Sequence, residues 1–89
     1  MREREMERIL KALANKRRLA IVRYLRKHDE AMVGDLSDYL KLSFRSTSKH
    51  LAVLFAADIV EKEQRGLQVW YRLSRVLPGV VKQISNSYE

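Results

Sequence analysis

LSFRSTSKHLAVL, residues 42–54, has the spacing of an amphipathic helix, and the rest of the chain is interpreted around it. Ser43 is a suitable N-cap because its hydroxyl accepts a hydrogen bond from a free amide of the first helical turn. At about 3.6 residues per turn, one side of the helix collects a mostly apolar set, namely Phe44, Thr47, Leu51, Leu54 and Phe55. We therefore predict a helix that buries this side.

The opposite side of the predicted helix is basic and rich in short side chains. Arg45 and Lys49 lie on it among serine and alanine residues, and no acidic residue occurs between Lys41 and Asp58. Short donors beside Arg and Lys suit a surface that must approach phosphates and base edges closely. When the helix is taken alone, an ordinary solvated face is the alternative interpretation.

The segments that flank this helix have the order of a winged helix-turn-helix. Residues 33–40 show a short amphipathic pattern, and only a brief turn separates them from the helix. Residues 59–64 and 68–73 alternate around a turn that contains glycine, which predicts a β-hairpin. The predicted fold class is mainly α with a small β-hairpin wing (α+β), in the order α-α-(β)-α-α-β-β-α.

Side chains of the predicted hairpin alternate between two faces. Tyr71 belongs to the set expected to face the core, while Trp70 and Arg72 share the other face. Arg65 is expected at the tip, where it and its basic neighbours, Lys62 and Arg72, reach a minor groove or its phosphates. A basic tip without a nucleic-acid role is the alternative.

The composition predicts a single small domain over residues 1–89. Hydrophobic residues make up 46% of the 89 residues, enough for a core, and the net charge is +7. A strongly basic balance indicates a polyanionic partner, although a basic protein without one is the alternative. Residues 15–28 carry six Lys or Arg and no acid, so the positive charge is concentrated on particular segments.

Asn15 is expected to cap a second helix that begins with three cations. Cations at the positive end of a helix dipole cost a few tenths of a kcal/mol each unless an anion compensates them. For Arg18 we expect an acidic neighbour such as Asp35 or Asp38, with a DNA phosphate as the alternative.

The two ends of the chain, residues 1–14 and 76–89, are predicted to be helices that pair with a second copy. The last helix is expected to start near Pro78, because proline fits a first helical turn. Packing of the first helix on its own domain alone is the alternative. The predicted dimer contacts are the apolar residues of both helices, Met6, Ile9, Leu10, Leu13, Val80, Val81 and Ile84.

The sequence lacks the residues that several classes of function require. The chain has no Cys, which excludes disulfides and thiolate metal sites. We find no phosphate-binding glycine loop and no nucleophile at a recognisable distance from a base, so we expect neither an enzyme nor a cofactor. The charged N-terminus and the absence of an apolar run near ~20 residues predict no signal peptide, no membrane contact and a cytoplasmic location.

Three blocks of the sequence, in order, resemble one known family. Residues 10–22, LKALANKRRLAIV, are similar to the family's opening LKALADPTRLRIL, and residues 42–54 are similar to its LSQSTVSHHLKVL. Residues 57–60, ADIV, followed by Arg65-Gly66 and by WYRL at 70–73, match its AGLV, R.G and YYRL. By these blocks the chain resembles the ArsR family of winged-helix transcriptional repressors.

This resemblance implies a homodimer that pairs through its terminal helices and represses by blocking polymerase. Two-fold symmetry then implies an inverted-repeat operator with half-sites about one helical turn apart. The recognition-helix residues expected at the DNA are Ser43, Phe44, Arg45, Ser46, Thr47, Ser48 and Lys49. The residues of the wing and flanks expected at phosphates are Lys41, Lys62, Arg65 and Arg72.

The chain departs from the family pattern in two places. Met32 and Gly34 stand where metal-sensing members carry the cysteines of CVCDL, so we predict no metal. His50 is expected to be a hydrogen-bonded structural histidine. Phe44 occupies a position where the family more often has Gln, and Phe either touches a thymine methyl or packs inward.

The sequence therefore predicts a regulator that binds specific double-stranded DNA as a homodimer, with Arg45 contacting guanine. Two alternatives use the same basic surface. One is a non-specific architectural DNA-binding protein, and the other is a winged-helix module that binds an acidic protein or RNA.

Overall fold

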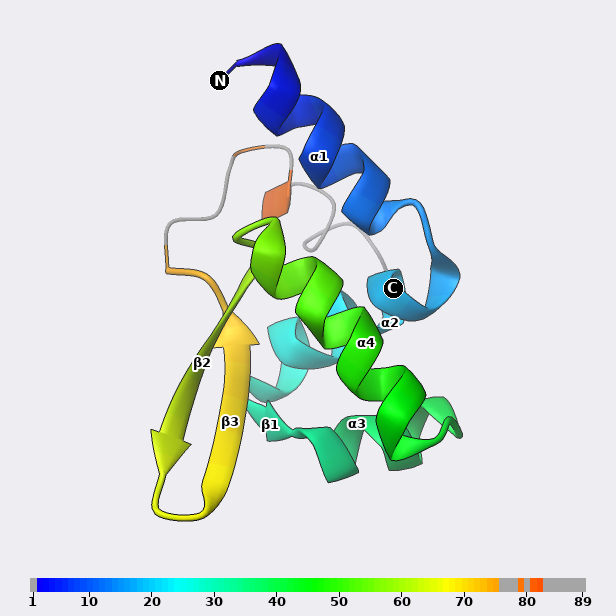
Figure 1. Cartoon of the computed structure of the whole chain (residues 1–89), viewed down its shortest axis with the longest axis vertical. Coiled ribbons are helices and arrows are strands. Elements are labelled where there is room, and N and C mark those ends of the chain that lie inside the picture. The colour runs from blue at the N-terminus through cyan, green and yellow to red at the C-terminus, as the bar shows by residue number, and fades with distance from the viewer. Residues whose placement is uncertain (1, 76–78, 80, 83–89) are drawn as a thin grey trace.

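The described residues of the computed structural model, 2–75, 79, 81 and 82, have the predicted order of elements (Figure 1). Gly79, Val81 and Lys82 are helical, and the remainder of the predicted last helix, including Val80 and Ile84, lies outside the described residues. The elements are α1 (Glu3–Leu13), α2 (Lys16–His28), β1 (Ala31–Met32), α3 (Val33–Leu40), α4 (Phe44–Ala56), β2 (Val60–Arg65) and β3 (Gln68–Leu73).

The two predicted N-caps are present. The Asn15 side chain accepts hydrogen bonds from the amides of Arg17, at 2.9 Å, and Arg18, at 3.1 Å. The Ser43 hydroxyl accepts from the Ser46 amide at 3.0 Å. These bonds satisfy amides that lack a partner within the helix, and they set where α2 and α4 begin.

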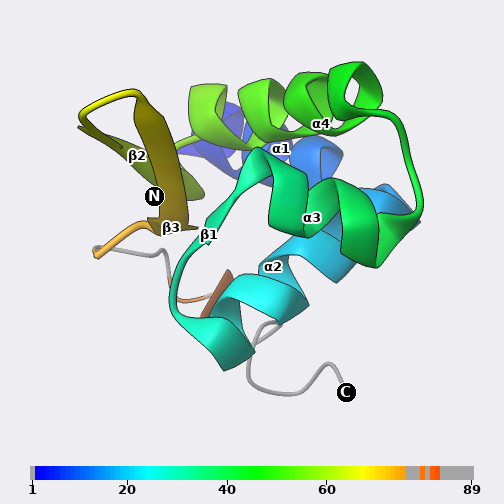
Figure 2. The same cartoon turned by 90° about the horizontal axis from the view of Figure 1, so that it is seen from below.

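The three strands form an antiparallel sheet in the order β1-β3-β2. In the register of β2 and β3, Glu61 lies opposite Arg72 and Lys62 opposite Tyr71. Tyr71 packs against the core as predicted, so Glu61 and Arg72 belong to the outer face of the sheet. Figure 2 shows the hairpin extending away from the helices beyond the short strand β1.

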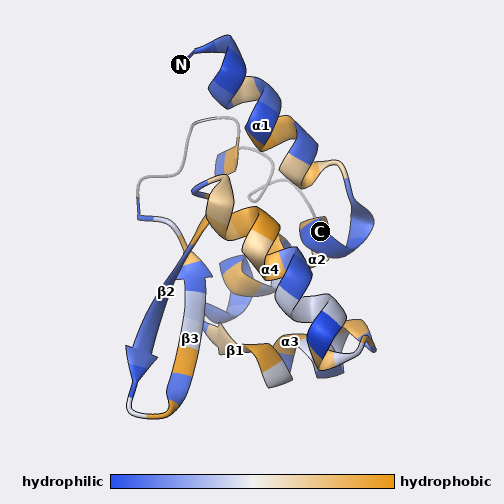
Figure 3. Ribbon diagram, viewed as in Figure 1, coloured by the Kyte–Doolittle hydropathy of each residue, from blue (hydrophilic) through white to orange (hydrophobic). Residues whose placement is uncertain are grey.

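The core lies between the helices and the inner face of the sheet, and Figure 3 shows apolar residues distributed over the helices that surround it. α4 contributes Thr47, Leu51 and Leu54, all completely buried. The Thr47 hydroxyl donates to the carbonyl oxygen of Ser43 at 2.9 Å, so this buried polar group is satisfied.

The predicted burial of Phe44 and Phe55 is wrong. Phe44 is 64% exposed and Phe55 is 42% exposed. At about 100° per residue, both lie on one edge of the arc that Thr47, Leu51 and Leu54 occupy, and that arc alone fills the contact with the core. Phe55 instead contacts Lys62, whose ammonium lies 4.6 Å from the ring centre.

Candidate nucleic-acid interface

The outward side of α4 presents a compact polar surface. Arg45, Ser46 and Lys49 are exposed, Ser48 is half-buried, and Phe44 adds an exposed ring at the first position. Among the residues that the structure describes, neither Arg45 nor Lys49 forms an ion pair. Arg45 therefore lies at the positive end of the helix dipole and Lys49 one turn further along the same side, and these unpaired cations suit an anionic partner.

Not every residue of the predicted recognition set is at this surface. Thr47 is completely buried, so its side chain holds the first turn of α4 to the core. Lys41 is exposed in the turn before α4 and has a left-handed backbone, φ 56°. That turn places its cation next to the start of the helix.

Arg18 has a different partner from the one predicted. Its guanidinium donates to the carbonyl oxygens of Ala12, at 2.6 Å, and Lys11, at 3.3 Å, and lies 3.3 Å from Nδ1 of His50. The expected ion pair with Asp35 or Asp38 is wrong, because the last carbonyls of α1 are closer and carry the negative end of that helix's dipole.

His50 is a structural histidine, as predicted, because its ring is hydrogen-bonded to Arg18 and half-buried. Partial burial, and then the nearby charges of Arg18 and Arg17, lower the pKa of His50 below its ordinary 6.5. The neutral imidazole of His50 thus lies against the Arg18 guanidinium where α1, α2 and α4 meet.

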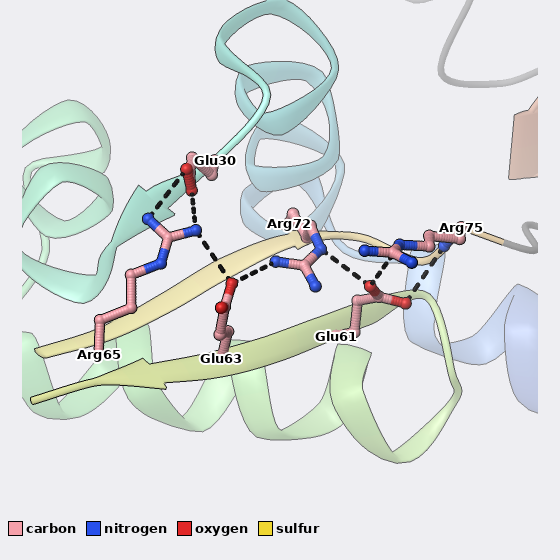
Figure 4. Close-up of polar contacts among 6 residues, drawn as sticks. All are labelled: Glu30, Glu61, Glu63, Arg65, Arg72 and Arg75. Carbon is pink, nitrogen blue, oxygen red and sulfur yellow. Dashed lines mark hydrogen bonds and ion pairs between the residues drawn. The ribbon is translucent and has the colours of Figure 1, made fainter.

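The wing carries a feature that the sequence pattern did not predict, a chain of ion pairs over its outer face (Figure 4). Its members are Glu30, Glu61, Glu63, Arg65, Arg72 and Arg75, which we call the wing ion-pair chain. The Arg65 guanidinium forms ion pairs with the carboxylates of Glu30 and Glu63, with N–O distances of 2.8 Å and 3.0 Å. Arg72 meets Glu61 at 2.8 Å and Glu63 at 2.9 Å.

The wing ion-pair chain also changes the titration of its carboxylates. Hydrogen bonds from Arg65 and then Arg72 lower the pKa of Glu63, while the amide of Arg75 and then the Arg72 side chain lower that of Glu61. The cross-strand positions 61 and 72 are a sequence signal for one pair. The contact with Glu30, which precedes β1, has no such signal because it depends on how the sheet closes.

These contacts change the electrostatics of the predicted wing surface. Arg65 and Arg72 both bind carboxylates within the chain, and Lys62 lies over Phe55. The ring of Trp70, the single tryptophan of the sequence, lies 5.1 Å from the Arg65 guanidinium. The wing cations are therefore partnered, unlike Arg45 and Lys49 on α4.

The predicted dimer contacts divide into two groups. Ile9, Leu13 and Val81 are buried in the core of the single chain. Met6 is half-buried and Leu10 is 46% exposed, and both line a shallow apolar surface along α1. Of the described residues in the set, Met6 and Leu10 are the ones accessible to a second chain.

The described residues bring together no group of three or more His, Asp or Glu that would suit a metal ion. In the same part of the chain, no helix combines the length and the apolar character that crossing a bilayer requires.

The fold and the basic face of α4 define a winged helix-turn-helix protein. The chain belongs to the arsR family of bacterial regulatory proteins, because residues 15–62 match the sequence pattern of that family. Its relatives are transcriptional regulators and not enzymes.

The similarity to individual members covers much of the chain. The chain is 42% identical to the transcriptional activator HlyU of Vibrio cholerae over 66 residues. This matched region spans 74% of the chain and 60% of HlyU. The chain is 32% identical over 71 residues to the arsenical resistance operon repressor of Bacillus subtilis, covering 80% and 68% of the two chains.

Solved structures agree with the fold. A structure of Vibrio cholerae HlyU has a TM-score of 0.83 at 33% identity and covers 99% of this chain and 98% of its own. The homodimeric winged helix-turn-helix DNA-binding domain Mb0332 of Mycobacterium bovis has a TM-score of 0.80 at 27% identity, covering 92% and 73%.

Proposed function

We propose that this chain is a homodimeric transcriptional regulator that binds specific sequences of double-stranded DNA through α4. The observation that supports this best is the outward side of α4. It is free of acidic residues, and among the described residues Arg45 and Lys49 have no carboxylate partner. The buried arc of Thr47, Leu51 and Leu54 holds this side outward.

The chemistry of each side chain suggests its role at the duplex. Arg45 has the planar donor pair that matches the O6 and N7 atoms of guanine in the major groove. Ser46, Ser48 and Lys49 complete the major-groove surface, and the exposed ring of Phe44 suits a thymine methyl.

The start of α4 and the wing would supply phosphate contacts that position the protein. Ser43 and Lys41 lie where the helix amides point outward. Lys62 is a further candidate. Arg65 and Arg72 are weaker candidates, because each would first have to exchange a glutamate of the wing ion-pair chain for a phosphate.

Dimerisation through α1 and the C-terminal segment would bring two α4 helices to one side of the duplex. Met6 and Leu10 offer apolar area on α1, and Mb0332 is described as homodimeric. A two-fold dimer would select an inverted repeat. Bound over a promoter in the cytoplasm, such a dimer would repress by excluding polymerase.

Binding-site selection from a random duplex library, followed by competition, tests this function. We expect the selected duplex to bind at least ~10³-fold more tightly than a shuffled duplex at physiological salt. Near-equal affinities with a steep salt dependence would identify an architectural protein instead. Preference for single-stranded RNA, or no binding to nucleic acid, would overturn the proposal.

A further inference from the structure

We propose that the wing contacts DNA through an apolar wedge, the side chain of Leu67, and not through its arginines. This inference rests on the duplex-binding function proposed above. It assigns Leu67 to the minor groove beside each site occupied by α4, where apolar side chains can enter between base steps and unstack them.

Leu67 is held outward by a tight two-residue turn. Arg65 and Gln68 are the last paired residues of the hairpin, so Gly66 and Leu67 alone form its loop. Gly66 has φ 64° and Leu67 does not share this positive sign, which is the pattern of a type II′ turn. The side chain of Leu67 is fully exposed at the end of the hairpin.

A single exposed leucine is common on protein surfaces and does not by itself indicate a contact. Here its position supplies the argument. The hairpin turn and the first turn of α4 both lie at the lower end of the molecule in Figure 1 and along its upper edge in Figure 2, separated by its width. A duplex that receives α4 in its major groove can therefore also reach the hairpin turn, which carries the fully exposed side chain of Leu67.

The wing ion-pair chain makes an ionic contact at this position less favourable. Arg65, the cation next to the turn, is bound to Glu30 and Glu63 at once, and a phosphate would have to displace both carboxylates. The same bonds connect the base of the turn to the start of β1, because Glu30 directly precedes that strand. The hairpin that carries Leu67 is therefore already ordered in the free protein, so binding costs little conformational entropy there.

The test measures the affinity of the wild-type protein and three variants for the duplex that wild type selects, over a range of salt concentrations. Leu67→Ala removes the wedge, and Arg65→Ala removes the cation beside it. Leu67→Met is the matched control, since it keeps an apolar side chain of similar size at the same position. Thermal unfolding and Trp70 fluorescence check that each hairpin is intact.

We expect Leu67→Ala to weaken binding about tenfold with an unchanged salt slope, because the lost group is apolar. Leu67→Met should change affinity less than about twofold, and Arg65→Ala should leave the salt slope unchanged. A fluorescent aminopurine base placed at the minor-groove steps flanking each half-site should brighten on binding wild type and not on binding Leu67→Ala.

Each other result overturns the inference. Equal affinity of Leu67→Ala and wild type would exclude a wing contact through this side chain, and weaker binding with unchanged aminopurine signals would exclude insertion. A salt slope lowered by about one in Arg65→Ala would assign the contact to the arginine. If wild type selects no duplex, the proposed function fails as well, which distinguishes the two failures.

Discussion

At the scale of single residues, Arg18 joins three helices at one point. It is anchored in α2, donates to two carbonyl oxygens at the end of α1, and lies against His50 of α4. Hydrogen bonds from a charged donor to carbonyls that have lost their helical partners contribute more than ordinary ones. The orientation of α1, and with it any dimer surface on α1, depends on this side chain.

Replacing Arg18 should therefore loosen the junction. We expect Arg18→Ala to lower the free energy of unfolding by about 2 kcal/mol, because it leaves the carbonyl oxygen of Ala12 without its charged donor. Arg17→Ala is the matched control: it removes an exposed neighbouring charge and should cost less than about 0.5 kcal/mol. Urea denaturation followed by Trp70 fluorescence measures both, and equal losses would show that charge and not hydrogen bonding matters.

His50, which lies against Arg18, gives the folded chain a pH dependence, because burial and then the charge of Arg18 lower its pKa. Because the pKa of His50 is lowered in the folded chain, the unfolded chain binds more protons between that value and 6.5. Stability should therefore fall as the pH is lowered through this range. Arg18→Ala should raise the pKa of His50 towards 6.5 in an NMR titration, and an unchanged or lower value would contradict the contact.

At the scale of elements, α2 combines an N-cap with an unfavourable charge arrangement. Asn15 satisfies two amides, while Lys16, Arg17 and Arg18 occupy the positive end of the helix. The charge of Arg18 is compensated by the end of α1, while the cap satisfies the backbone amides of Arg17 and Arg18. The start of α2 is thus more dependent on its cap than a helix that opens with acidic residues.

This dependence can be measured with two substitutions. Asn15→Ala should lower the free energy of unfolding by about 1 kcal/mol through loss of the cap. Asn15→Asp keeps the acceptor and adds a negative charge beside three cations, so it should be at least as stable as wild type. Thermal unfolding of both variants gives the comparison, and a destabilised Asn15→Asp would contradict this account of the helix start.

The sequence was sufficient to predict the elements because their signals are local. The caps Asn15 and Ser43, the helical spacing and the alternation of the hairpin each involve residues close together in the chain. The burial of Phe44 and Phe55 was predicted wrongly because a helical wheel gives direction and not the width of the contact. Only the packed structure shows how narrow that contact is.

The residues of the candidate site could be predicted where they lie on one helix. The contacts that join several elements could not be predicted. The basic face of α4 follows from residues within a few turns. The partners of Arg18 and Arg65, in contrast, come from α1 and from the residue before β1. From the sequence alone, several acidic residues are equally plausible partners for each arginine. Only the folded structure shows which group lies near it.

At the scale of the whole molecule, the surface of α1 is the place where a second copy would add most. Met6 and Leu10 form an apolar strip, whereas Ile9 and Leu13 on the same helix are already committed to the core. A chain of 89 residues has a limited core of its own, so burying this strip would also stabilise the fold.

A charge placed on this strip should separate the copies. We expect Leu10→Glu to shift the protein towards a monomer in sedimentation experiments and to weaken duplex binding at least tenfold, because one half-site then binds alone. Val53→Glu introduces the same charge at a site of similar exposure, 41% against 46%, and should leave the oligomeric state unchanged. A dimeric Leu10→Glu would move the interface away from this part of α1.

A binding measurement at the level of single base pairs tests whether the outward side of α4 reads base edges. It compares the affinity for the selected duplex with that for duplexes changed at one base pair at a time, using wild type, Arg45→Ala and Arg4→Ala. Arg4 lies on α1, at the other end of the molecule, and controls for the lost charge. We predict that Arg45→Ala loses roughly 1–3 kcal/mol of discrimination at a single G·C position, whereas Arg4→Ala keeps the full preference. Equal weakening of every duplex by Arg45→Ala would contradict base recognition by α4.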